Sequence, residues 1–229
     1  MSLRRRELFG KEGGLFFVTT SFHKQRSLLL DDRYYRIILG SLAFLRQKYK
    51  FDVIAYVVMS THLHLILFIW KGTTLSDIMR DFKKFTAYKI RRQLEEDGAF
   101  DLLDSLRVAS DSCQEVTPDT TNSVTPDTTK VPSGVTSRRK EQTPDTTRVP
   151  SGVTSRRKVQ KFKIWEDRFD DLYITQERTF WTKFNYIHNN PIKAGLVEKP
   201  EDYPYSSAKN YYLGTKGGLL KIDIDFVSG

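Results

Sequence analysis

The sequence predicts an α+β protein built on an antiparallel sheet. Segments rich in aromatic and β-branched residues alternate with amphipathic helical segments, in the order strand, helix, strand, strand, helix, strand, helix. With 229 residues, of which 39% are hydrophobic, the chain has enough apolar material for one ordinary core. We therefore expect a single folded domain and exclude a chain that is disordered throughout.

The first half of the chain supplies three strands and two helices. Residues 15–20 follow a glycine pair and read as a strand, and residues 31–49 carry apolar side chains at helical spacing behind two aspartates that can cap the helix. Residues 51–59 and 62–70 are separated by only two polar residues, which predicts an antiparallel pair. Residues 75–94 form a second amphipathic helix with a basic outer side.

The second half supplies one strand and one helix. Residues 161–174 form an aromatic strand segment around Trp165 and Phe169, and residues 176–188 form a helix that we expect to end at Asn189-Asn190, because the residue before Pro191 disfavours helical geometry. The whole order suits the split β-α-β arrangement called ferredoxin-like, with two helices on one face of the sheet. The last helix lies outside that repeat.

A stretch of different composition, at about residues 101–160, separates the two halves. Thr, Ser, Pro, Asp, Arg and Lys replace the aromatic and aliphatic residues found on either side. The stretch also repeats itself: residues 117–121 recur at 125–129 and 143–147, and residues 131–140 recur at 149–158. Because these units lack large apolar residues, we expect a disordered insert in a domain that otherwise spans residues 1–229. Its Ser-Arg-Arg-Lys clusters leave open a contribution to nonspecific phosphate binding.

Charge and cysteine content narrow the partner and the compartment. Lys and Arg number 37 against 28 Asp and Glu, a net charge of +9 that favours a polyanionic partner such as nucleic acid or an anionic membrane surface. Cys113 is the single cysteine, so neither an intrachain disulfide nor a cysteine-based zinc cluster is possible. The longest apolar run, residues 63–70, is too short to span a membrane, and no signal-peptide core follows the basic start. We expect a soluble cytoplasmic protein.

Two histidines in the third strand segment could do chemistry. Strand periodicity places His62 and His64 on one face, with Leu63 on the other. Two such imidazoles can share a metal ion, and a pair of hydrogen-bonded, half-buried histidines is the alternative. On the last helix, Tyr186 and Asn190 share one face and could complete the site, although a tyrosine there could equally be a packing residue. His188 is a rival ligand in a poorer helical position.

Five segments resemble one family. Residues 59–65 (Met-Ser-Thr-His-Leu-His-Leu) resemble the HUH motif, histidine–hydrophobic–histidine on a strand, of single-tyrosine transposases. Residues 184–197 resemble the tyrosine helix and following turn of the REP-associated tyrosine transposases, a branch of that superfamily. Residues 16–19, 164–169 and 202–207 support the same branch. The resemblance extends over about residues 16–211, the insert excepted.

The resemblance implies a role for each matched residue. It makes His62 and His64 paired metal ligands, Tyr186 the nucleophile and Asn190 the third metal ligand, where related insertion-sequence transposases commonly have glutamine. The implied cofactor is Mg²⁺ or Mn²⁺, whereas imidazole ligands alone would favour zinc or manganese. The implied protein is a metal-dependent single-stranded DNA endonuclease and strand transferase. It would form a 5′-phosphotyrosine intermediate at REP-type hairpins and associate with the nucleoid, as a monomer that uses its own tyrosine or as a dimer that exchanges tyrosine helices.

Several basic and aromatic side chains are candidate DNA contacts. They are Arg4, Arg5 and Arg6 near the start, Lys83, Lys84 and Tyr88 on the second helix, and Arg168 in the last strand segment. Each has a plainer interpretation as part of a basic tail, a solvated helix face or a surface ion pair. Two alternatives to a tyrosine-dependent strand transferase stay open. One is a catalytically inactive nucleic-acid-binding module, and the other is a histidine–metal hydrolase in which Tyr186 only orients the substrate.

Overall fold

A computed structural model describes residues 12–107, 162–215, 220–224 and 227. These residues belong to one compact unit, and the second unit, residues 109–159, lies outside the described ranges. The described unit contains a four-stranded antiparallel sheet made of β1 (Gly13–Ser21), β2 (Phe51–Val58), β3 (His62–Trp70) and β4 (Asp170–Ile174). The strand order is β2-β3-β1-β4. This is the order of a split β-α-β sheet, so the predicted α+β, ferredoxin-like fold is confirmed.

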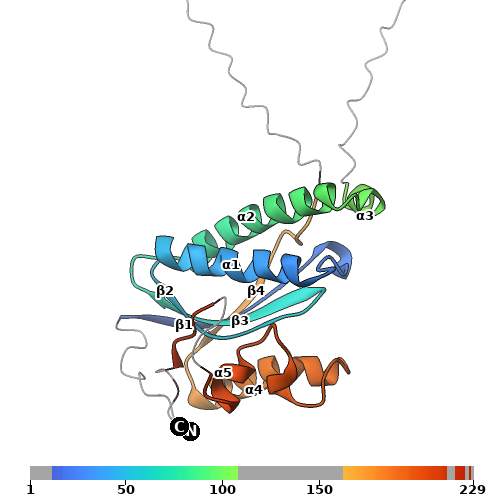
Figure 1. The fold of residues 1–229 in the computed structure, drawn as a ribbon. Helices are drawn as coiled ribbons and strands as arrows, with labels where there is room; N and C mark the ends of the chain where they lie inside the picture. The colour runs from blue at the N-terminus through green and yellow to red at the C-terminus, as the bar shows by residue number, and fades with distance from the viewer. Residues whose placement is uncertain (1–11, 108–161, 216–219, 225–226, 228–229) are drawn as a thin grey trace, which may run out of the picture. The chain divides into compact units, whose positions relative to one another are not determined.

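Two helices pack on one face of the sheet, above it in Figure 1. They are α1 (Asp32–Lys48), which begins after the side-chain cap of Asp31, and α2 (Leu75–Glu96), which begins after the cap of Thr74. The alternating residues Leu63, Leu65, Leu67 and Ile69 of β3 point into this core. The short helix η2 (His23–Gln25) lies between β1 and α1 in the chain, and the short helix α3 (Phe100–Ser105) follows α2.

The last helix covers the opposite face of the sheet, where α4 (Glu177–Lys193) and the short α5 (Ala208–Tyr212) lie below it in Figure 1. Phe180, Phe184 and Ile187 of α4 join Ile66 and Phe68 of β3 in a second core. A short 3₁₀ helix, η3 (Pro200–Asp202), connects α4 to α5. The sheet is therefore buried on both faces, and this second layer positions the candidate site.

Two expected boundaries were wrong. The strand expected over residues 161–174 forms only at β4, because the Trp165 ring turns into the α1–α2 core, where it stacks on Phe22 at a centroid distance of 4.2 Å and donates to Thr86 Oγ1 at 2.8 Å. The last helix continues through Pro191 to Lys193. The buried Pro191 lies near its end, where Ala194 N–H donates to Asn190 O and Leu196 N–H to Pro191 O.

The described chain reaches both ends of the predicted insert. Residues 101–107 still belong to the folded unit, since Leu103 and Leu106 are buried and Arg107 pairs with Phe162 in an isolated antiparallel bridge. The repeats themselves lie outside the described residues. None of the described helices has the length and hydrophobicity required to cross a bilayer.

Candidate functional site

The two histidines share one face of β3, as strand periodicity predicted, and this is the face on which α4 packs. The odd-numbered apolar residues of β3, from Leu63 onward, point to α1 and α2, whereas the even-numbered Ile66 and Phe68 belong to the second core. The histidines occupy even-numbered positions at the start of β3, so they lie beside the second core. The His62 and His64 ring centroids lie 4.7 Å apart with an interplanar angle of 70°. His64 is 4% exposed, whereas His62 is half-buried. The two imidazoles therefore share one small space.

Threonine hydroxyls orient both imidazoles. Thr61 Oγ1 and His62 Nδ1 share a hydrogen bond of 2.8 Å, and so do Thr19 Oγ1 and His64 Nδ1. Thr19 lies directly opposite His64 in the register of β1 and β3. With each Nδ1 engaged, the Nε2 atoms are left for another partner, and His64 Nε2 is buried without a hydrogen-bond partner among the described residues.

Burial keeps both imidazoles neutral. It lowers the pKa of His64 to about 3, with smaller contributions from His62 and Lys183, and it lowers the pKa of His62 against the opposing effect of a hydrogen bond with Asn190. A neutral imidazole with one nitrogen engaged and the other free is the form that binds a metal ion.

Helix α4 brings Tyr186 to the histidines. Its buried side packs on the sheet through Phe180, Phe184 and Ile187, which leaves Tyr186 at the flank of the helix, 37% exposed. The Tyr186 and His64 ring centroids lie 5.0 Å apart at 70°, and Phe17 of β1 contacts both rings. His64 and Tyr186 are more than 120 positions apart in the sequence, and the fold brings their rings into contact.

Asn190 lies beside the histidines. It follows Tyr186 by one helical turn, and its side chain lies within hydrogen-bonding reach of His62. No group of three or more His, Cys, Asp or Glu side chains with metal-binding geometry occurs in the described part of the chain. The orphaned Nε2 of His64 and the amide of Asn190 fit a divalent cation with mixed nitrogen and oxygen ligands.

Sequence analysis missed two lysines at this site. Lys183 Nζ lies 4.6 Å from the Phe17 ring centroid and 5.8 Å from that of Tyr186, and Lys193 Nζ lies 5.5 Å from the Tyr186 ring. Both share the helical face of Tyr186 and Asn190, because the spacing of the four residues is three, four and three. That spacing was the available signal. The site is therefore positively charged where an anionic substrate would approach the tyrosine.

His188 does not join the site. It is fully buried, its Nε2 and Ser207 Oγ share a hydrogen bond of 2.8 Å, and burial lowers its pKa to about 3. Ser207 Oγ also accepts from the backbone N–H of Tyr56, and Tyr203 donates to the Val58 carbonyl at 2.9 Å. His188 and the segment at residues 202–207 therefore anchor α4 to β2 rather than bind a metal.

The other predicted DNA contacts lie elsewhere or outside the described residues. Lys84 and Tyr88 are exposed on α2, across the sheet from the histidines, so the structure does not bring them together with Tyr186 (Figure 1). Lys83 Nζ donates to the carbonyls of Glu166 and Arg168 at 2.9 and 2.7 Å, and burial lowers its pKa to about 8. Lys83 therefore holds this segment against α2, a contact that neither the predicted DNA contact nor the alternative of a solvated helix face included. Arg168 is exposed, and Arg4, Arg5 and Arg6 lie outside the described ranges.

Comparisons with known proteins show what the chain is similar to. The sequence matches the family described as Transposase IS200 like over residues 18–101, which include both histidines and end before α4. A REP-associated tyrosine transposase, solved bound to a REP hairpin, matches at 17% identity and a TM-score of 0.52, covering 94% of this chain and 93% of that one. A transposase candidate from Deinococcus radiodurans matches at 16% identity and a TM-score of 0.31, covering 37% of this chain and 64% of that one. Comparison with curated proteins gives no match. Over residues 18–101 the chain is similar to the IS200-like transposases, and it has the fold of a REP-associated tyrosine transposase.

Proposed function

We propose that this protein is a metal-dependent enzyme that nicks and rejoins single-stranded DNA at REP-type hairpins, with Tyr186 as the nucleophile. The observation that carries the proposal is the meeting of Tyr186 with His64 at a ring distance of 5.0 Å, beside a buried imidazole nitrogen that has no partner among the described residues. A packing tyrosine would need neither the paired histidines nor the two nearby ammonium groups.

His62, His64 and Asn190 would hold the metal ion, Mg²⁺ or Mn²⁺. When bound, such an ion polarises the scissile phosphate and neutralises part of its charge. The protein's contribution is to keep the two imidazoles neutral and oriented, through burial and through the hydroxyls of Thr61 and Thr19.

The chemical step is an exchange of one phosphodiester for another. The Tyr186 hydroxyl oxygen attacks phosphorus and loses its proton, a new O–P bond forms to the tyrosine, and the bond from phosphorus to the 3′ oxygen breaks. The leaving 3′ oxygen takes up a proton and becomes a free hydroxyl, so the products are a 5′-phosphotyrosine and a 3′-OH end. Because the covalent bond keeps the phosphodiester energy, the hydroxyl can reverse the reaction without ATP.

Lys183 and Lys193 would bind the phosphate during this step. Their ammonium groups lie 5.8 and 5.5 Å from the centroid of the Tyr186 ring. Fixed positive charge at the place where negative charge accumulates stabilises the transition state more than the ground state.

The tyrosine would act within its own chain. Helix α4 packs on the sheet that carries the histidines, and Tyr186 contacts His64 without a second copy. A mixture of the His64→Ala and Tyr186→Phe proteins tests this directly. A monomer acting in cis stays inactive in the mixture, whereas dimers that exchange helices regain cleavage.

The experiment for the activity uses hairpin DNA labelled at the 5′ or the 3′ end, incubated with wild type or Tyr186→Phe in Mg²⁺, Mn²⁺ or EDTA. We expect wild type to release the upstream fragment with a free 3′-OH and to become linked to the 5′ phosphate of the downstream fragment, and both products should be lost in EDTA. Tyr186→Phe should bind the same DNA and cut none of it.

Two results would replace the proposal. Binding of several hairpins without any adduct would favour a non-catalytic binding module. Cleavage that persists in Tyr186→Phe would identify water as the nucleophile and make the protein a histidine–metal hydrolase.

A further inference from the structure

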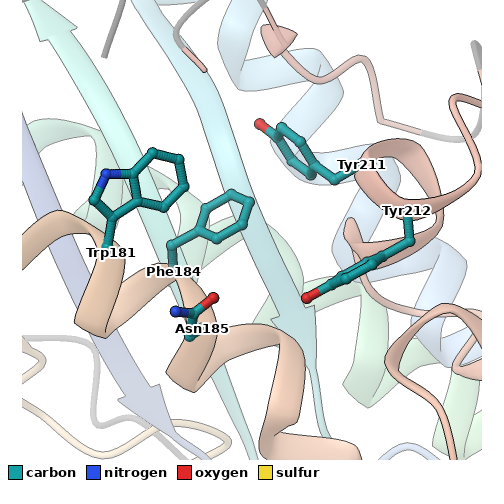
Figure 2. A pocket seen from close by; sticks show the side chains of 5 residues that line it. All are labelled: Trp181, Phe184, Asn185, Tyr211 and Tyr212. Carbon is teal, nitrogen blue, oxygen red and sulfur yellow. The ribbon is translucent and has the colours of Figure 1, made fainter. Parts of the chain in front are cut away.

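A second site lies on α4, away from the tyrosine. A pocket of about 280 Å³ is lined by Trp181, Phe184 and Asn185 of α4 and by Tyr211 and Tyr212 of α5. Figure 2 shows the α4 side chains on one side and the two tyrosines on the other, with the Tyr212 hydroxyl directed toward α4. Four aromatic rings and one amide therefore surround a space that neither the metal site nor the tyrosine uses.

Part of the pocket wall is held in place by the fold. Tyr211 donates to the backbone carbonyl of Ile54, and its ring meets that of Phe184 at 4.8 Å and 81°. Trp181 Nε1 donates to Glu177 Oε1 at 3.3 Å while its ring contacts Phe184 at 5.4 Å. Tyr212, by contrast, is 50% exposed, and its ring lies 6.0 Å from that of the buried His188. The pocket thus combines aromatic rings packed in the core with one half-exposed aromatic ring.

We propose that this pocket binds an unpaired nucleobase of the DNA strand that Tyr186 attacks. Every base has a flat face that stacks on aromatic side chains. The Asn185 amide offers one acceptor and two donors to a base edge, a complement that a purely apolar ligand would leave unused. This inference rests on the proposed function, because that function defines which DNA strand is bound. Stacking of a base in the pocket does not itself require that the strand be cleaved.

Charge around the pocket suits the same ligand. Arg178 stands one turn before Trp181 on α4, and Lys209 stands one turn before Tyr212 on α5, both exposed. A basic side chain therefore accompanies each of the two helices that form the pocket, as a strand with a phosphate on either side of the bound base requires.

The position of the pocket limits which base it can take. Asn185 and Tyr186 are consecutive in α4, so their side chains point about 100° apart around the helix axis, and the pocket lies on a different side of α4 from the tyrosine. A helix with its side chains is about 10–12 Å wide, and stacked nucleotides rise about 3.4 Å each. The base that enters the pocket should accordingly lie within about four nucleotides of the scissile phosphate.

The test combines protein variants with abasic DNA, in a Tyr186→Phe background so that no cleavage intervenes. Hairpin DNA with single-stranded flanks receives one abasic site at a time at each of the four nucleotides on either side of the junction, and affinity is measured by titration. We expect one position at which the abasic site weakens binding about fivefold or more, the lower end of what loss of a stacking aromatic produces. Tyr212→Ala should weaken binding of intact DNA by a similar factor and add no further loss at that position.

Matched controls come from neighbouring side chains. Leu213→Ala removes an apolar side chain that is 59% exposed and outside the pocket, and Asn189→Ala removes an amide one turn beyond Asn185. Both should leave the affinity and the abasic profile unchanged, whereas Asn185→Ala should flatten the preference for a particular base at the sensitive position.

The outcomes separate this inference from the activity. Independent, additive losses from Tyr212→Ala and from every abasic site would overturn the pocket while leaving the tyrosine chemistry intact, and so would unchanged binding by Tyr212→Ala. A wild type that forms no adduct on the same DNA, combined with non-additive losses in the Tyr186→Phe background, would sink the proposed cleavage and keep the pocket. Failure of the Tyr186→Phe protein to bind any hairpin DNA would overturn both.

Discussion

Thr19 shows how one hydroxyl can control a ligand on a neighbouring strand. It is bonded to His64 Nδ1 at 2.8 Å, and the Nδ1–H form of the ring is the one that leaves Nε2 free for a metal. We predict that Thr19→Val, which keeps the shape of the side chain, lowers Mn²⁺ affinity about tenfold or more, the usual effect of losing such an orienting partner. Titration calorimetry with Mn²⁺ on the DNA-free protein measures it.

The next residue of the same strand is the control. Thr20 Oγ1 is buried on the opposite face and has no hydrogen-bond partner among the described residues. Thr20→Val should leave Mn²⁺ affinity unchanged and should not lower the free energy of unfolding, because it removes a hydroxyl that burial leaves unsatisfied. Equal loss of metal affinity in both variants would mean that Thr19 acts only through packing.

At this scale sequence analysis singled out the four residues that the structure brings together and missed the side chains that support them. His62, His64, Tyr186 and Asn190 were selected because periodicity and resemblance both pick out residues by type and spacing. Thr19 could not be found, since its link to His64 spans 45 positions and depends on strand register. Lys83 was misplaced for a related reason: helical periodicity gave it a basic outer face, and only packing of the segment after α3 reveals that its ammonium is half-buried.

At the scale of the element, the end of α4 holds Asn190 in place. Gly195 has φ +68°, and its N–H donates to Ile192 O while Leu196 N–H donates to Pro191 O, the pattern of a Schellman turn. We predict that Gly195→Ala lowers the free energy of unfolding by about 1 kcal/mol. Gly40 in α1, where an added Cβ meets nothing within 4 Å, should respond with the opposite sign, a gain of about 1 kcal/mol.

Chemical denaturation of the two variants tests this pair. If both alanine variants shift the urea midpoint in the same direction, then the left-handed turn after α4 does not terminate the helix as described.

A carboxylate joins α1 to α2. Asp81 of α2 accepts from Lys48 Nζ and from the Tyr49 hydroxyl, and these hydrogen bonds lower its pKa to about 2. Because the folded-state pKa lies below the ordinary value, the stabilisation is complete above about pH 4 and is lost as the pH falls through about 2. Asp81→Asn should therefore cost about 1 kcal/mol near neutral pH and progressively less in acid.

Urea unfolding of wild type and Asp81→Asn across this pH range measures the effect, with the exposed Glu96→Gln as control. A difference that persists unchanged down to about pH 2 would show that the carboxylate charge is not what stabilises the helix pair.

The elements were predictable to different degrees. α1, α2 and the first three strands follow from local pattern, because their apolar spacing matches a single face or two faces of one core. The bounds of β4 and the end of α4 did not follow from local pattern. The Trp165 ring packs in the core between the sheet and α1 and α2, where it donates to Thr86, and the turn after α4 satisfies the carbonyl of Pro191. α5 carries too few residues to show a period.

At the scale of the whole molecule, the insert enters and leaves at adjacent positions. Arg107 and Phe162 form a bridge, and Lys163 N–H donates to Leu106 O at 2.8 Å. We predict that a short Gly-Ser turn can replace residues 108–161 with a change in unfolding free energy of no more than about 1–2 kcal/mol, because shortening a loop lowers its closure entropy only slowly. Adduct formation by Tyr186 should survive.

Urea unfolding and the labelled-hairpin assay on the deletion variant check this prediction. Loss of cooperative unfolding would show that residues 108–161 contribute to the core, and loss of hairpin binding alone would assign their basic clusters to the DNA interface.

The most direct test of the account is to identify the amino acid that becomes linked to DNA. Wild type is incubated with hairpin DNA and divalent metal, digested with trypsin and nuclease, and analysed by mass spectrometry. Cleavage after Lys183 and Lys193 releases residues 184–193, which contain Tyr186 as their single tyrosine. The account predicts a nucleotide adduct on this peptide at Tyr186, absent in EDTA. An adduct on any other peptide, or cleaved DNA without an adduct, would contradict it.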